Sequence, residues 1–240
     1  MFDIIAFDAD DTLWHNESLY TATQAKFAAL LALYVDGADV ERQLYATESR
    51  NIAYFGYGIK SFALSMIETA IALTEGRVTS ADIEQIIAFA KEMIDTPTQL
   101  LDGVAEVVAQ VAASHKLMLI TKGDLLDQER KLERSGLSDY FDHIEIVSEK
   151  TEATYRALLK HYAIAPERFL MVGNSLKSDV LPILALGGHA VHVPYHTTWV
   201  HEQVNPTSVQ QAQYVTLAHI SELPGLIEQI DDTTTKNQQI

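Results

Sequence analysis

The sequence predicts an α/β protein in which a Rossmann-like parallel sheet, with helices on both faces, is interrupted by an inserted all-helical domain. Three observations support this fold class. A short apolar run occupies residues 4–7, helical periodicity without strands extends over about residues 18–94, and helices alternate with short apolar runs from about residue 102 onward. We therefore expect an α/β domain that the chain leaves after its first strand and later re-enters.

The first apolar run predicts a buried strand, because a continuous apolar stretch this short suits the interior of a parallel sheet. In the block that follows, apolar residues recur at helical spacing and no strand intervenes. Breaks between its helices are expected near residues 36–37, 56–58 and 75–76. These observations place the α/β core at residues 1–15 and 96–240 and the helical insertion at residues 16–95.

The rest of the chain alternates between helices and strands. We expect helices at about residues 104–114, 125–135, 152–162, 178–186 and 223–230, and strands at residues 117–120, 144–147, 169–172, 190–193 and 214–217. Because a strand, a helix and a second parallel strand form a right-handed unit, this alternation predicts a parallel sheet. The polar tail from Asp231 to Ile240 is expected to fray.

Composition excludes several classes of protein. The chain has 240 residues, with 17 Lys plus Arg against 33 Asp plus Glu, which gives a net charge of −16. This charge argues against binding to nucleic acids or to an anionic membrane surface. The absence of cysteine excludes disulfides and thiolate sites. Without a long apolar segment or a basic N-terminal leader, we expect a cytoplasmic protein that is not embedded in a membrane.

Polar residues follow four of the expected strands, at the point where each strand ends. Asp8, Asp10 and Thr12 follow the first strand, and Thr121, Lys122 and Gly123 follow the second. Lys150 follows the third strand, and Asn174 and Asp179 follow the fourth. Loop ends are often polar, so one such patch has little meaning by itself. Four at successive strand ends indicate a site, because ligands of parallel sheets bind beyond the carboxyl ends of the strands.

The residue types at these ends suit phosphoryl transfer. Crowded carboxylates repel one another, and oxygen ligands favour Mg²⁺ as the neutralising cation. The Thr121 hydroxyl, the N–H groups near Lys122 and Gly123, and the Lys150 ammonium could hold phosphate oxygens. A carboxylate could attack the phosphorus, and a second one two residues later could protonate the leaving oxygen.

This arrangement resembles the haloacid dehalogenase superfamily, in particular its phosphatase branch with a helical C1-type cap. The segment from Asp8 to Leu13 matches the first motif of that family, Asp-x-Asp-x-Thr after an apolar strand. The resemblance implies that Asp8 is the nucleophile and an Mg²⁺ ligand. It implies that Asp10 is the general acid and base, with its backbone carbonyl on the metal, and that Thr12 holds the turn.

Three further motifs occur in the family's order. Thr121 ends the second strand, Lys150 matches the lone lysine of the third motif, and the segment from Gly173 to Asp179 matches the fourth. The resemblance makes Thr121 and Lys150 catalytic and Asp179 a metal ligand. Asn174 stands where the family usually has an aspartate, so an uncharged amide oxygen is expected on the metal. Lys122 competes with Lys150 as the phosphate-binding lysine, and Thr12 and Gly123 are further candidates for contact with the phosphate.

We therefore expect a Mg²⁺-dependent phosphomonoester hydrolase that acts on a small phosphorylated metabolite through an aspartyl-phosphate on Asp8. The alternatives are a metal-independent haloacid dehalogenase, a phosphomutase, and a weakly catalytic protein that binds phosphate or a partner. Sugar phosphates, nucleotides and flavin mononucleotide all remain open as substrates, and the protein is expected to be a monomer or a homodimer. For Tyr54, Phe55 and Tyr57 we favour packing inside the helical insertion over stacking on a ligand.

Overall fold

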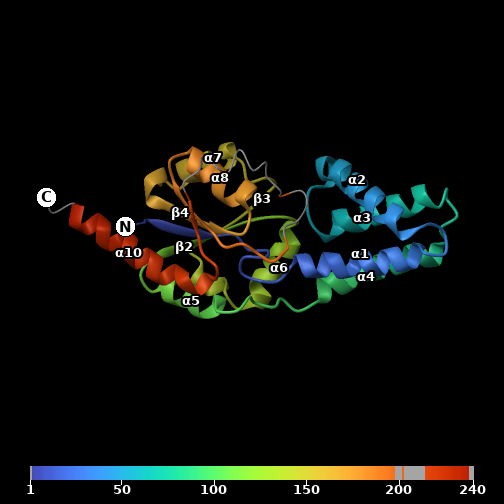
Figure 1. Cartoon of the computed structure of the whole chain (residues 1–240), viewed down its shortest axis with the longest axis horizontal. Helices are drawn as coiled ribbons and strands as arrows, with labels where there is room; N and C mark the ends of the chain where they lie inside the picture. Colours follow the sequence, from blue (N-terminus) through green and yellow to red (C-terminus); the bar gives the residue numbers. More distant parts are fainter. Residues whose placement is uncertain (1, 198–201, 203–213, 238–240) are drawn as a thin grey trace. The chain divides into compact units, whose positions relative to one another are not determined.

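The computed structural model describes residues 2–197, 202 and 214–237 (Figure 1). The chain divides into two compact units. The core unit contains residues 1–15, 98–122 and 132–240, and the helical unit contains residues 16–97 and 123–131. The boundaries expected from the sequence differ mainly at residues 123–131, which the sequence places in the core and the structure places in the helical unit.

The core unit is built on a six-stranded parallel sheet with the strand order β3-β2-β1-β4-β5-β6. The strands are β1 (Ile4–Phe7), β2 (Lys116–Lys122), β3 (His143–Val147), β4 (Phe169–Gly173), β5 (His189–His192) and β6 (Val215–Thr216). The central strand β1 pairs with β2 on one side and with β4 on the other. The carboxyl ends of these three strands therefore meet at one edge of the sheet.

Helices cover both faces of this sheet (Figure 1). The helices α5 (Val104–Ala112) and α10 (Leu223–Asn237) pack on the face that contains Ile5 and Phe7. The helices α7 (Glu152–His161) and α8 (Leu181–Ala185) pack on the face that contains Ile4 and Ala6. All four β1 residues are buried because alternate side chains enter two different cores. The predicted α/β fold class is confirmed.

The helical unit contains α1 (Glu17–Leu31), α2 (Gly37–Phe55), α3 (Ile59–Leu73) and α4 (Ser80–Asp95), and it has an apolar core of its own. Helix α4 begins with a capping box, in which the Thr79 hydroxyl accepts from the Asp82 N–H and the Asp82 carboxylate accepts from the Thr79 N–H. The turn from α2 to α3 contains Gly56 and Gly58, both with positive φ. The N-terminal part of α6 (Leu125–Ser135) also belongs to this unit.

The aromatic residues near the end of α2 correct one expectation. Tyr54 is 82% exposed and Phe55 is 54% exposed, so neither belongs to the core of the helical unit. Their rings lie 6.3 Å apart at a tilt. Tyr57, in the turn that follows, is partly buried. Val40 and Leu44 anchor the earlier turns of α2 in the core of the helical unit, whereas Tyr54 and Phe55 belong to its last turn, so helical spacing alone did not reveal their exposure.

Two elements of the core unit differ from the sequence-based expectations. Helix α10 continues to Asn237, past the point at which fraying was expected. After β4 the chain forms a π-helical turn, Leu176–Val180, before the short α8, where one continuous helix was expected from residue 178. No helix in the described part of the chain is both long and apolar enough to cross a membrane.

Candidate active site

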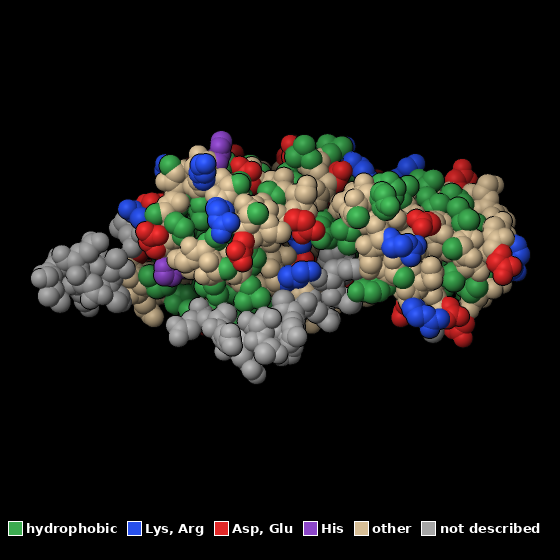
Figure 2. Space-filling model, turned by 90° about the horizontal axis from the view of Figure 1, so that it is seen from above, with side chains coloured by type: hydrophobic (Ala, Val, Ile, Leu, Met, Phe, Trp, Pro, Cys, Tyr) green, Lys and Arg blue, Asp and Glu red, His purple; other side chains and the backbone are tan. Residues whose placement is uncertain are grey.

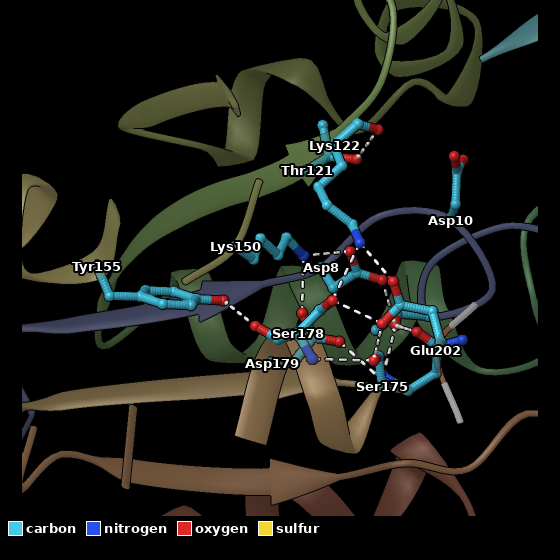
Figure 3. A network of polar contacts seen from close by, with 12 residues as sticks. Asp8, Asp10, Thr121, Lys122, Lys150, Tyr155, Ser175, Ser178, Asp179 and Glu202 are labelled. Atoms are coloured by element: carbon cyan, nitrogen blue, oxygen red, sulfur yellow. Dashed lines mark hydrogen bonds and ion pairs between the residues drawn. The ribbon is translucent and has the colours of Figure 1, made fainter. Parts of the chain in front are cut away.

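The candidate site lies at the carboxyl edge of the sheet, where the loops after β1, β2 and β4 meet (Figure 3). Asp8 follows β1 directly, and its N–H donates to the carbonyl of Val172 on β4 at 2.9 Å. This bond extends the pairing of β1 with β4 by one residue. It fixes the Asp8 backbone against the glycine-containing loop that carries Asp179.

A buried ion-pair network forms the centre of the site. The Lys150 ammonium lies 2.5 Å from Asp8 Oδ1 and 2.7 Å from Asp179 Oδ1. Lys150 is 4% exposed and Asp8 is 8% exposed. The structure thus brings together three residues that the sequence places after three different strands.

The network has unusual electrostatics. Burial raises the pKa of Asp8 to about 7, against a lowering by the nearby Lys150 ammonium and together with a further raising by Asp179. Burial by itself would lower the pKa of Lys150, but Asp179 and Asp8 raise it above its ordinary value. Lys150 therefore stays charged, and the pKa of the Asp8 carboxyl group lies above its ordinary value.

Thr12 fixes the orientation of the Asp8 carboxylate. Its hydroxyl donates to Asp8 Oδ2 at 2.8 Å and accepts from the Asn174 N–H at 3.0 Å, while Asn174 Oδ1 lies 3.4 Å away. The tight turn before it passes through Asp11 at a φ of 61°. Thr12 is buried, and its hydroxyl links the Asp8 carboxylate to the start of the loop after β4.

Asp10 is held apart from this network. Its Oδ1 accepts a hydrogen bond of 2.7 Å from the Trp14 indole. In Figure 3 its carboxylate points away from Asp8. Asp10 is partly exposed.

The loop after β4 holds Asp179 in place. Asp179 Oδ2 accepts from the Ser175 N–H at 3.0 Å, and the Ser175 hydroxyl accepts from the Ser178 N–H at 3.0 Å. Gly173 ends β4, and the structure leaves no room for a side chain at this position, because an added Cβ would lie 2.6 Å from the Cβ of Asp179. The π-helical turn therefore presents the Asp179 carboxylate back toward the end of β4.

The residues after β2 have different surroundings. The Thr121 hydroxyl is buried and donates weakly to the Lys122 carbonyl at 3.4 Å. Gly123 has a φ of +140°, and a Cβ there would lie 2.9 Å from Gln128 Nε2. The Lys122 ammonium pairs with Glu202 and lies 3.0 Å from the Ser178 hydroxyl, whereas Lys150 is the lysine that contacts Asp8.

Glu202 is a member of the site that sequence reasoning did not find. Its carboxylate accepts from Lys122, from the Ser175 hydroxyl and, at 2.6 Å, from the Ser178 hydroxyl. Glu202 follows none of the expected strands directly and belongs to no motif, so the sequence contains no signal for it.

Residues at this edge carry oxygen atoms of the kinds that bind a hard divalent cation. They are carboxylate oxygens of Asp8 and Asp179, the amide oxygen of Asn174 and the backbone carbonyl of Asp10, and Mg²⁺ prefers oxygen ligands of these kinds. Within the described residues, no group of three or more His, Cys, Asp and Glu side chains is placed to hold a metal. An amide and a backbone carbonyl would therefore have to complete the set.

Comparison with known proteins agrees with this geometry. The family model of haloacid dehalogenase-like hydrolases matches residues 2–187. The chain belongs to this family. A solved structure of a haloacid dehalogenase-like family hydrolase from Xanthomonas campestris is 40% identical, has a TM-score of 0.87, and is matched over 98% of this chain and 94% of that one. The family expected from the sequence is confirmed, and the chain is a hydrolase.

Relatives within the haloacid dehalogenase-like hydrolases include several phosphatases. Pyrimidine 5'-nucleotidase YjjG of Escherichia coli is 26% identical over 91% of this chain and 95% of its own length. N-acylneuraminate-9-phosphatase of Mus musculus is 30% identical, over 55% of this chain and 53% of that protein. A 2-haloacid dehalogenase structure from Pseudomonas syringae, 18% identical with a TM-score of 0.62 over 95% of this chain and 99% of that one, shares the fold.

Proposed function

We propose that this protein is a Mg²⁺-dependent phosphatase that hydrolyses small phosphate monoesters through an aspartyl-phosphate on Asp8. The observation that carries the proposal is the Asp8 carboxylate, buried at the sheet edge between the Lys150 ammonium and the Thr12 hydroxyl. A carboxylate fixed in this way can attack a phosphorus atom placed at the open end of β1. The phosphatases among the relatives support the same reaction class.

The residues divide the chemistry into two steps. In the first, an Asp8 oxygen forms a bond to phosphorus, the ester P–O bond breaks, and Asp10 gives a proton to the leaving oxygen. In the second, Asp10 takes a proton from water, the water oxygen bonds to phosphorus, and the Asp8–phosphorus bond breaks. Inorganic phosphate leaves and both aspartates return to their starting forms. Asp10 must first leave its hydrogen bond with Trp14.

The other residues bind and orient the substrate. The Lys150 ammonium pairs with Asp8 and Asp179 and offsets part of their negative charge, and it can also donate a hydrogen bond to a phosphate oxygen. The Thr121 hydroxyl and the N–H groups of Lys122 and Gly123 follow the same sheet edge and suit further phosphate oxygens. Asp8, the Asp10 carbonyl, Asn174 and Asp179 would hold Mg²⁺. When bound, the metal supplies positive charge that stabilises the phosphoryl group during transfer.

We assign the helical unit as the cap that restricts the choice of substrate. Tyr54 and Phe55 are large and exposed, so they are available to contact a ligand. We expect Tyr54→Ala and Phe55→Ala to raise KM for the preferred ester and to leave kcat nearly unchanged. The Tyr45→Ala variant, at another exposed tyrosine of α2, is the matched control. Equal kinetics in all three variants would exclude a role for this aromatic pair.

Hydrolysis and the covalent step can be tested together. A panel of monoesters that includes pyrimidine nucleotides and sugar phosphates is assayed for phosphate release with Mg²⁺, or with a chelator. The Asp8→Asn variant is expected to lose turnover while keeping its thermal melting curve, and Asp139→Asn, at an exposed aspartate, is expected to keep activity. When the reaction with an ester labelled on its phosphoryl group is quenched with acid, the label should remain attached to the protein without substitutions and should be absent from Asp8→Asn. Full activity of Asp8→Asn would overturn the mechanism.

One observation favours a second candidate, a metal-independent dehalogenase. The loop after β4 carries the neutral Asn174, and the Lys150 ammonium pairs with both the Asp8 and the Asp179 carboxylates. Such an enzyme would use the same Asp8 carboxylate to displace a halide from carbon. Halide release from 2-haloacids in the presence of a chelator would support it. Phosphate release that a chelator abolishes, without halide release, would exclude it.

A further inference from the structure

An internal carboxylate occupies a cluster of hydrogen-bond donors beside the proposed nucleophile. The carboxylate belongs to Glu202, and its donors are the Lys122 ammonium and the hydroxyls of Ser175 and Ser178. Lys122 ends β2, and the two serines belong to the loop that presents Asp179. In Figure 3 the Lys122 side chain runs from the end of β2 toward Asp8 and Ser178. The two serines therefore share a loop with Asp179, and Lys122 comes from the end of a strand that is paired with β1.

These donors have the properties of an oxyanion site. The side chains of Lys122 and Glu202 are 14% and 13% exposed, so their interaction is shielded from water. Burial by itself would raise the pKa of Glu202, but the Lys122 ammonium, together with the hydrogen bonds from Ser175 and Ser178, holds that pKa below its ordinary value. One charged donor and two hydroxyls converge on two carboxylate oxygens, which is the pattern used for phosphate and carboxylate ligands.

We propose that Lys122, Ser175 and Ser178 form an oxyanion-binding subsite that Glu202 occupies in the free protein and yields to an anionic group of the substrate. The inference rests on the proposed phosphatase function, because it assigns a regulated subsite to that same active site. The ligand class is a small oxyanion, either the reacting phosphoryl group or a second anionic group of the same molecule. Glu202 is thus a built-in competitor of the substrate.

The competition follows from charge. A single Lys122 ammonium can balance one anion at short range, and a phosphate placed beside an ionised Glu202 would be repelled. If Glu202 occupies the subsite about nine-tenths of the time, its removal should tighten anion binding about tenfold. The same removal takes away no donor from the subsite. A purely structural Glu202 would have the opposite effect, because its loss would let Lys122, Ser175 and Ser178 drift apart.

Calorimetric titration with inorganic phosphate provides the test. With Mg²⁺ present, Glu202→Ala is expected to lower the Kd for phosphate about tenfold, and Glu202→Gln to lower it less because the amide keeps its hydrogen bonds with the serines. Glu228→Ala, at an exposed glutamate on α10, is the matched control and should leave the Kd unchanged. The gain should vanish in the Lys122→Met, Glu202→Ala double variant.

Two esters identify which anion uses the subsite. One has a neutral leaving group and the other has a leaving group that carries a carboxylate. If Lys122→Met raises KM for both esters, the subsite binds the reacting phosphoryl group; if it raises KM for the second alone, the subsite binds the additional carboxylate. Either result supports the subsite, and an unchanged KM for both contradicts it.

An unchanged or raised Kd for phosphate in both Glu202 variants, with normal melting curves, would overturn the inference. Glu202→Gln keeps the shape of the side chain, so it serves if Glu202→Ala does not fold. Phosphate binding needs no turnover, so the two proposals can fail separately. If the Glu202 variants bind phosphate more tightly but no ester is hydrolysed, only the proposed phosphatase function is rejected. If esters are hydrolysed but phosphate binding does not tighten, only the proposed competition by Glu202 is rejected.

Discussion

At the scale of single residues, the site depends on a few side chains that the sequence identifies and a few that it does not. Asp8, Lys150 and Asp179 were predictable because each follows an apolar run or lies in a spaced motif, and parallel strands bring such residues to one edge. Glu202 was not predictable, because it follows no expected strand directly and belongs to no motif, although its carboxylate pairs with Lys122.

Lys150→Met should show what holds the buried carboxylates together. Removal of the ammonium leaves the buried Asp8 and Asp179 carboxyl groups without their cationic partner, so we expect a loss of about 3 kcal/mol in the free energy of unfolding near pH 8. Part of this loss should be recovered in acid, because the carboxyls then take up protons. Urea denaturation measures the change, and Lys160→Met, at an exposed lysine of α7, is the control. Equal losses in the two variants would contradict a structural role for the buried pair.

Glu48 should make the stability of the protein depend on pH. It is 8% exposed on α2, and burial raises its pKa to about 7 from 4.5. Between these two pH values the Glu48 carboxyl group is ionised in the unfolded chain and protonated in the folded protein. The free energy of unfolding therefore falls as the pH rises toward 7. The full penalty above that pH is about 3 kcal/mol.

Glu48→Gln removes this titration. We expect the stability advantage of the variant over the unmodified protein to be small near pH 4.5 and to grow until about pH 7, as denaturation at several pH values would measure. Glu41→Gln, at an exposed position of the same helix, should show no such trend. A constant difference across this range would mean that Glu48 is ionised in the folded protein.

At the scale of elements, the order and type of most helices and strands could be predicted, because apolar periodicity and turn residues record them directly. The conformation of the loop after β4 could not be predicted in this way. Its residues suit an α-helix, but the hydrogen bond from the Ser175 N–H to Asp179 and the close approach of Gly173 to Asp179 favour a π-helical turn there. The continuation of α10 to Asn237 was also missed, because its last residues are polar.

Gly173→Ala should disrupt the site through this loop. A Cβ at Gly173 would lie 2.6 Å from the Cβ of Asp179, so the Asp179 side chain must shift from the position in which it pairs with Lys150. We expect a loss of about a hundredfold in kcat/KM for the preferred phosphate ester. Gly225→Ala, on α10 with no atom within 4 Å of the added Cβ, should keep full activity. Retained activity in Gly173→Ala would show that the exact place of Asp179 is unimportant.

The start of α4 offers a test of the helical unit. Thr79→Ala removes the hydroxyl that accepts from the Asp82 N–H, and we expect a loss of about 1 kcal/mol in stability. Ser80→Ala changes a neighbouring exposed residue of the same helix and should alter stability by less than about 0.5 kcal/mol. Denaturation curves of both variants measure these changes in stability. Similar curves for the two variants would mean that the capping box does not contribute to stability.

At the scale of the whole molecule, the net charge of −16 disfavours long polyanions as ligands. Figure 2 shows basic side chains scattered among acidic ones over the visible face, without a continuous basic stripe. At the candidate site, Lys150 is balanced by Asp8 and Asp179, and Lys122 by Glu202. A small phosphate ester can be held by a few local donors, whereas a long polyanion must also approach the acidic surface around them.

Competition by a nucleic acid tests this argument. We expect a 5'-phosphorylated DNA strand of about 20 nucleotides not to inhibit hydrolysis of a small phosphate ester at about 20 mM salt, where electrostatic forces act over the longest range. Inorganic phosphate serves as the positive control for competition. Proteins that neutralise nucleic-acid phosphates bind more weakly as salt rises, so inhibition that is strong at about 20 mM salt and fades at about 200 mM would contradict the argument. If repulsion dominates, any inhibition by the strand should instead increase with salt, because salt screens the acidic surface and lets the strand approach.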